Sequence, residues 1–239
     1  MIKFSCVLGA LSALLFSLSS RAASFEEICQ GLPATPLITV SLIPVTVADT
    51  IVEGDMQSMT IRTTGADSLH ELATVGTTLA NRVWDLSYGL NVITDRDSGR
   101  VCYRPAIHVA VGYDPMRISV ARPFHSGTCA YDVIVAHERE HVRIYNNFLP
   151  IAAESIEQTV RSRLSRKVRY ASSAEAANAD MRQILRSEVS GVVKDEMAKS
   201  QALHSQFDSI EESLHMLNSC NGEIQRDARP AWDRSSEDR

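Results

Sequence analysis

The front half of the chain has the hydrophobic pattern of β-strands. Five segments are rich in Val, Ile and Thr or alternate between apolar and polar residues: Leu37–Val47, Met59–Thr64, Leu90–Thr94, Ala106–Tyr113 and Arg117–Ala121. Both features are typical of strands. Asp95–Gly99 combines Asp, Ser and Gly, which is the composition of a turn. We therefore predict a β-rich region over residues 36–124.

One segment within this region has helical periodicity instead. Its apolar residues recur at intervals of three or four positions: Leu69, Leu72, Val75, Leu79 and Val83. This spacing places them on one face of a helix, and Asp67 or Ser68 provides an N-cap. The pattern predicts a helix over Asp67–Trp84.

The second half of the chain has helical periodicity throughout. Three helices are expected: Thr128–Phe148, a second from Pro150 to about Tyr170, and a third from Ser173 to Leu217 that is interrupted near Gly191. The first is expected to end before Pro150, because proline disrupts a helix interior but suits the first turn of a new helix. A helical region over residues 126–220 behind a β-rich one predicts an α+β fold.

The two ends of the chain differ from the part between them. A lysine near the start is followed by an apolar run over Phe4–Phe16 and small residues at Ser20 and Ala22, the pattern of a secretory signal peptide. We predict cleavage of residues 1–22 near Ala22 and a periplasmic or secreted protein. The run is too short for a membrane span. Residues 225–239 are charged and apolar-poor, and are expected to be disordered.

The net charge of the chain argues against one class of partner. The formal net charge of the chain is −5, and it becomes −7 once Lys3 and Arg21 leave with the signal. Such acidity argues against binding to nucleic acid, which needs a basic surface. Residues 23–224 are numerous enough to bury a core of their own. We predict that they form a single domain.

Four cysteines remain after removal of the signal: Cys29, Cys102, Cys129 and Cys220. An even number in an exported chain predicts two disulfides, with three possible connectivities. We favour Cys102–Cys129, which closes a short loop, together with Cys29–Cys220, which ties the two ends of the domain. A zinc site made of all four cysteines is the alternative, although the chain has no Cys-x-x-Cys pair to start one.

The strongest chemical signal is the motif His137-Glu138-x-x-His141. On a helix, residues four apart lie one turn above each other, so both imidazoles can bind one ion. Imidazole nitrogen suits zinc, and three protein ligands leave a fourth position for water. Glu138 is placed to take a proton from that water. The motif therefore predicts Zn²⁺ as the cofactor and hydrolysis by metal-activated water.

A solvent-exposed helix face is the alternative interpretation of this segment. Arg139, Glu140 and Arg143 lie beside the motif and would form a charged, hydrated face. The apolar run Val133–Ala136 directly upstream favours a buried helix instead. A buried helix seldom places unpaired Glu and His on its apolar stripe, because their burial is costly. We therefore favour the metal site.

Several residues are candidates for the third metal ligand. Glu154 and Glu157 lie on the next predicted helix, where thermolysin-like enzymes carry a carboxylate ligand. His204 and Asp208 lie four residues apart on one face of a later helix. The spacing alone leaves these alternatives open.

The sequence resembles a family of uncharacterised secreted bacterial proteins that are predicted to be zinc-dependent proteases. The matching segments are Ala136–Ile144 and Gln206–Asp208, within a similarity that covers about Ala106–Leu217. The resemblance implies a zincin-like α+β fold and makes Asp208 the first choice for the third ligand. In this family the aspartate is followed by Thr and then His-Gly, whereas Ser209–Ser213 follows here.

These features together predict a zinc-dependent metallopeptidase that acts on extracytoplasmic protein or peptide, such as that of the cell envelope. In this hypothesis the strand Arg117–Ala121 runs along the metal cleft and its free edge holds an extended substrate. A zinc amidase acting on cell-wall peptide would use the same chemistry. The alternatives from another class are a non-catalytic metal-binding module and a helical envelope interaction protein.

Overall fold

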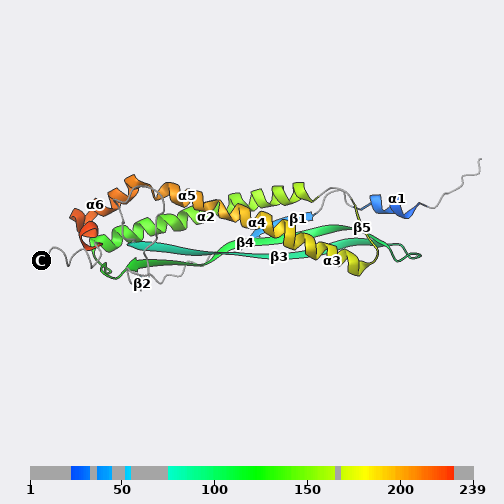
Figure 1. Ribbon diagram of the computed structural model, residues 1–239, viewed down its shortest axis with the longest axis horizontal. Helices are drawn as coiled ribbons and strands as arrows, with labels where there is room; N and C mark the ends of the chain where they lie inside the picture. The colour runs from blue at the N-terminus through cyan, green and yellow to red at the C-terminus, as the bar shows by residue number, and fades with distance from the viewer. Residues whose placement is uncertain (1–22, 33–36, 45–51, 55–74, 165–167, 229–239) are drawn as a thin grey trace, which may run out of the picture.

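The computed structural model describes residues 23–32, 37–44, 52–54, 75–164 and 168–228. The predicted signal peptide, the strand predicted at Met59–Thr64 and residues 229–239 lie outside this part of the chain. Within it the architecture is α+β, as predicted: a small mixed sheet is accompanied by several helices (Figure 1).

A long antiparallel hairpin forms the centre of the fold. Its two strands are β3 (Gly76–Thr94) and β4 (Val101–Ala121). The predicted turn joins them: the Ser98 hydroxyl donates to the carboxylate of Asp95, and Gly99 adopts a positive φ of 72°. Glycine occupies this left-handed conformation without the steric cost that a Cβ imposes.

Strand β3 takes the place of the helix predicted over Asp67–Trp84, wherever that segment is described. Residues 76–84 pair with β4, and residues 67–74 lie outside the described part. Pairing with β4 satisfies the backbone groups of the segment and overrides its helical spacing. Leu79, which a helix would have buried, is 53% exposed.

Strand β4 has neighbours on both edges. β3 lies along one edge, while β5 (Arg169–Ala171), β1 (Leu37–Leu42) and β2 (Val52–Gly54) pair in turn with the other. The predicted free edge at Arg117–Ala121 is therefore wrong, because this segment lies between β3 and β2. β3 contacts the motif helix at Glu138, and among the described strands it pairs with β4 alone, so its other edge is unpaired.

A bulge keeps one side of β4 facing the core. Relative to β3, β4 has an extra residue between Tyr113 and Met116. The core side chains are odd-numbered before this point and even-numbered after it: Ile107, Val109, Val111 and Tyr113, then Met116, Ile118 and Val120. Side chains of a strand alternate between its two faces, so one extra residue changes which residues face the core from odd-numbered to even-numbered. The strand therefore keeps its core face on both sides of the bulge. The two strands predicted here are thus one bulged strand.

Helix α2 (Cys129–Arg163) packs along the core face of the hairpin. The predicted break at Pro150 is wrong, since α2 continues through it for 13 further residues. Proline removes the N–H that would have bonded the carbonyl of Asn146. Both residues are exposed, so water can bond that carbonyl, and the helix continues because its apolar face stays packed on the sheet.

The third predicted helix is a series of shorter ones. α3 (Ala174–Ile184) leads through a π-helical turn at 185–189 into α4 (Ser190–Ala198), then α5 (Ser200–Phe207) and α6 (Ile210–Asp227). The predicted interruption lies near this π-helical turn, while Gly191 itself is inside α4. Since α6 reaches Asp227, residues 225–227 are helical and not disordered. None of the described helices is long and apolar enough to cross a bilayer.

The four cysteines form two disulfides, as predicted, but with a different pairing. Cys29 in α1 (Phe25–Gln30) bonds Cys102 in β4, and Cys129 at the start of α2 bonds Cys220 in α6. The predicted pairs Cys102–Cys129 and Cys29–Cys220 are therefore wrong. Cys102 and Cys129 lie near opposite ends of the hairpin, since β4 runs the full length of the sheet between them.

Candidate metal centre

Helix α2 holds the motif at the boundary between core and solvent. The Thr128 hydroxyl caps the helix by accepting from a backbone N–H in its first turn, and Ile134 is fully buried on the face that packs against the sheet. One turn later this face carries Glu138 and then His141, both buried, beside His137, whose side chain is 10% exposed. The apolar residues upstream therefore fix the orientation of the polar ones.

The motif side chains gather around one point. The potential ligand atoms of His137, Glu138 and His141 all lie within 4.8 Å of one another. The two imidazole rings are 5.1 Å apart, centre to centre, because the residues are one helical turn apart. This group could hold a metal ion, in agreement with the metal-binding part of the prediction.

Asp208 joins the two histidines from the break between α5 and α6. Its Oδ1 lies 2.9 Å from Nε2 of His141 and 3.3 Å from Nε2 of His137. Atoms that bind one tetrahedral zinc at about 2.0–2.1 Å are themselves about 3.3 Å apart. The carboxylate thus stands at the separation expected of a third ligand, although the close group formed by the motif residues does not include it.

The local sequence explains why the chain breaks at Asp208. Ser209 follows in extended conformation and accepts the backbone N–H of Glu212, as an N-cap residue does. Ser-x-x-Glu is the sequence signature of a helix start. The cap ends α5, begins α6, and leaves the Asp208 side chain directed at the histidines.

The other ring nitrogens of both histidines also have partners. Nδ1 of His137 lies 3.5 Å from Oε1 of Glu212, and Nδ1 of His141 lies 2.9 Å from Nδ1 of His204. A partner at Nδ1 fixes the ring orientation and leaves the Nε2 lone pair for a metal, which is a common arrangement around bound zinc. Both Nε2 atoms face Asp208 here.

His204 is suited to accept a hydrogen bond from the Nδ1–H of His141. It is buried, and its pKa falls to about 4 because burial and the neighbouring His141 both disfavour the charged form. A neutral His204 accepts at Nδ1 when its proton is on Nε2. Its ring packs against Tyr145, with the ring centres 4.0 Å apart. His204 therefore supports a candidate ligand and is not itself directed at the point shared by the Nε2 atoms.

Strand β3 contacts Glu138 directly. The Thr78 hydroxyl lies 2.8 Å from Oε2 of Glu138 and 2.9 Å from its backbone carbonyl. Gly76 permits this approach, since a Cβ there would lie 2.6 Å from Oε1 of Glu138. Burial raises the pKa of Glu138, and the Thr78 hydrogen bond opposes that rise. Neither Thr78 nor Gly76 belongs to a motif, so the sequence carried no signal for them.

The charges of the centre shift one another's pKa values. Burial lowers the pKa of His137, but its hydrogen bond to Asp208 and the charge of Glu138 outweigh that effect, so the net shift is upward. Burial raises the pKa of Asp208, yet hydrogen bonds from His137 and His141 hold it well below its usual range. Positive charge between these groups is therefore favoured, and a divalent cation would supply it with neutral imidazoles.

The two remaining ligand candidates lie elsewhere. Glu154 and Glu157 belong to α2 itself, about 20 and 24 Å along its axis from His141. Glu154 accepts from Gln158, and Glu157 is paired with Arg161. The structure does not bring them to the histidines, because α2 does not turn at Pro150.

Phe207 forms one wall of the centre. Its ring stacks on His137 with centres 4.8 Å apart, and it meets His141 edge-on at 5.1 Å. The centre is more open to solvent on the side of Asp208, since 46% of that side chain is exposed. The centre is thus enclosed by α2, β3 and Phe207, with its solvent access on the Asp208 side.

Comparison with known proteins does not place this chain in a family. No protein-family model, curated protein or solved structure matches it. The chemistry of the centre is therefore argued from its own geometry.

Proposed function

We propose that this chain is a zinc-dependent hydrolase of peptide bonds, with His137, His141 and Asp208 as ligands and Glu138 as the general base. The observation that carries the proposal is the position of Asp208, whose Oδ1 lies within 3.3 Å of both Nε2 atoms. Two imidazoles and one carboxylate form a ligand set of catalytic zinc sites and leave a fourth position free. The resemblance to predicted zinc-dependent proteases, zincin-like in arrangement, supports the same ligands.

The donor set determines which carboxylate binds and which acts as base. Asp208 faces both Nε2 atoms, whereas Glu138 is held against β3 by Thr78. Bound zinc would polarise the substrate carbonyl and acidify water in the open position. Glu138 would receive the proton of that water, and the burial that raises its pKa makes it a stronger base than an exposed carboxylate.

Strand β3 offers a way to align an extended substrate. Its first residues touch Glu138, and among the described strands it pairs on one edge only. An unpaired edge binds extended peptide through main-chain hydrogen bonds. In this proposal β3, and not Arg117–Ala121, is the strand that binds the extended substrate.

A non-catalytic metal-binding module is the second candidate function. It is favoured by the low exposure of the two imidazole side chains, 10% for His137 and 11% for His141. In such a module all coordination positions would be closed to water, as in structural zinc sites. Activity measurements separate the two candidates.

The test compares Glu138→Gln with Glu154→Gln in the zinc-loaded protein, using cleavage of fluorescently labelled casein. Glu138→Gln is expected to retain its zinc and to lose cleavage by roughly 10²- to 10⁴-fold, the usual contribution of a general base. Glu154→Gln removes a carboxylate from the exposed face of the same helix and should leave the rate unchanged. A Glu138→Gln protein that cleaves casein at the wild-type rate would refute the proposed mechanism.

A further inference from the structure

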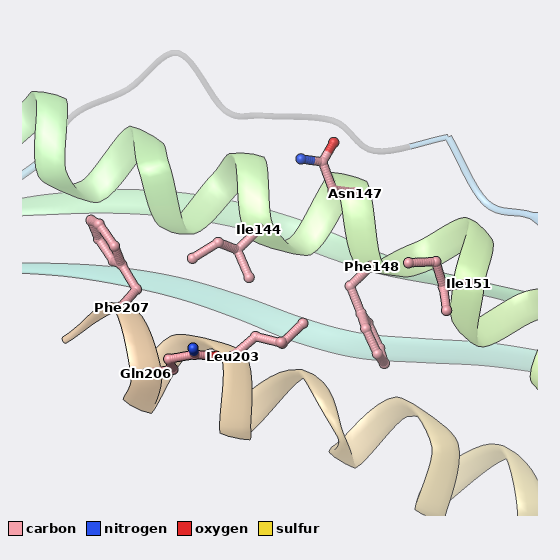
Figure 2. Close-up of a pocket in the computed structure, with 7 residues that line it drawn as sticks. All are labelled: Ile144, Asn147, Phe148, Ile151, Leu203, Gln206 and Phe207. Carbon is pink, nitrogen blue, oxygen red and sulfur yellow. The ribbon is translucent and has the colours of Figure 1, made fainter. Parts of the chain in front are cut away.

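An apolar groove adjoins the metal centre, between α2 and α5 (Figure 2). Its volume is about 310 Å³, and five of its lining side chains are apolar: Ile144, Phe148, Ile151, Leu203 and Phe207. The remaining lining residues are two uncharged amides. Ile151 and Leu203 are 65% and 41% exposed, so the groove presents apolar surface to solvent, and covering that surface would be favourable.

The groove and the metal centre share a wall. Phe207 lines the groove and also contacts the imidazoles of His137 and His141. Ile144, which lies opposite α5 in Figure 2, follows His141 by less than one helical turn. A substrate bound at the centre would therefore have the groove within reach of its neighbouring side chains.

We propose that this groove binds a large apolar side chain of the peptide substrate, close to the bond that is cleaved. The inference rests on the proposed function and adds the class of substrate. Ile144 and Ile151 are about 10 Å apart along α2, whereas side chains on one face of an extended peptide recur every ~6.6 Å. The groove thus spans one large side chain or two smaller alternate ones.

The size and chemistry of the groove favour leucine, methionine or phenylalanine over charged residues. Its volume of about 310 Å³ accommodates one such side chain. A charged side chain would lose hydration there without meeting an opposite charge, because none of the lining residues is charged. The expected substrate is therefore an extended, apolar-rich polypeptide segment.

The test maps cleavage sites in a peptide library made by digesting a whole proteome, with the zinc-loaded full-length protein and mass spectrometry. Wild type should prefer a large apolar residue at one position near the cleaved bond, by roughly 10- to 100-fold over alanine. Leu203→Asp should abolish this preference and favour Lys or Arg at that position. Leu214→Asp changes a comparably exposed leucine of α6 that does not line the groove, and should retain the wild-type preference.

A second variant and a binding measurement guard against indirect effects of Leu203→Asp, which lies next to His204. Ile151→Asp alters the opposite wall, far from the ligands, and should reduce the same preference. Calorimetry on zinc-loaded Glu138→Gln should show weaker binding of a leucine-containing peptide when Leu203→Asp is added. Cleavage with no apolar preference, or with one that both groove variants retain, would overturn the inference alone. Zinc binding without any cleavage by wild type would overturn the proposed function, and the inference with it.

Discussion

Each end of the molecule has a disulfide and a cluster of polar side chains, but the two clusters differ in how their polar groups are paired. At the far end, Cys29–Cys102 joins α1 to β4, and the Tyr103 hydroxyl donates to Asp180, which also pairs with Arg169. At the site end, Cys129–Cys220 joins α2 to α6. There two imidazoles and two carboxylates converge instead of forming separate pairs.

The two polar clusters differ in whether their charges are balanced within the cluster. Burial and the nearby Asp180 raise the pKa of Tyr103 to about 12, so the tyrosine stays a neutral donor to an anion that Arg169 balances. At the site end, Nε2 of His204 is buried without a hydrogen-bond partner among the described residues, and His137 and His141 both direct Nε2 at one carboxylate oxygen. Hydrogen bonds from protonated imidazoles satisfy that oxygen, and a cation at the shared point would do so with neutral imidazoles.

The largest expected difference between the two ends follows from removing each disulfide in turn. The two bridges span 73 and 91 residues, so replacing either cysteine pair by serine should cost a similar free energy of unfolding, about 2–5 kcal/mol. Only loss of Cys129–Cys220 should also weaken zinc binding, because α6 carries Glu212 and follows Asp208 directly. Urea unfolding and zinc titration against a chelator measure the two effects. Equal zinc affinities in both double variants would show that α6 needs no anchor.

Changes at the Nδ1 partners should have the next largest effect. Replacing Glu212 by Gln or His204 by Phe removes a group that orients a ligand imidazole, and each should weaken zinc affinity by roughly 10- to 100-fold. At the far end Tyr103→Phe removes a comparable buried hydrogen bond and should lower stability without changing zinc affinity. Chelator competition on the three variants measures their zinc affinities. A Tyr103→Phe effect as large as that of Glu212→Gln would count against specific orientation.

The smallest expected effect is a pH shift from Thr78→Val. The Thr78 hydrogen bond holds down the pKa of Glu138, so its loss raises that pKa further. Glu138 accepts a proton only when ionised, so the acid limb of the rate profile should move to higher pH. Thr77→Val, on the other face of β3, is the control and should leave the profile in place. An acid limb that moves to lower pH in Thr78→Val would contradict the assignment of Glu138 as base.

The sequence predicted the parts of the fold that depend on local pattern. The motif helix and the strands beside the Asp95–Gly99 turn have clear hydrophobic periodicity, and the turn itself has a typical turn composition. The start of β3 was misread because Leu79 and Val83 have helical spacing by coincidence, and only pairing with β4 decides their conformation. Likewise Pro150 is tolerated because its position is exposed, which the local sequence does not show. The disulfide pairing depends on which ends of the hairpin the cysteines occupy.

The candidate site was predictable only where its residues share a motif. His137, Glu138 and His141 follow from their spacing. Asp208 was one of several candidates by spacing, and a resemblance made it the first choice. Thr78 lies 60 positions from Glu138, and its contact arises from the way β3 packs on α2. Glu212 could have been noticed as the end of the Ser-x-x-Glu cap, but its contact with His137 required the fold.

The most direct test of the central claim is the metal content per chain of the purified protein, for wild type, His137→Ala and Asp208→Ala. The proposed centre predicts about one zinc per wild-type chain and its loss in His137→Ala, with Asp208→Ala binding zinc much more weakly. Tyr103→Phe should keep the wild-type content. Wild-type protein without zinc, or zinc that His137→Ala retains in full, would contradict the account and favour a helical interaction protein.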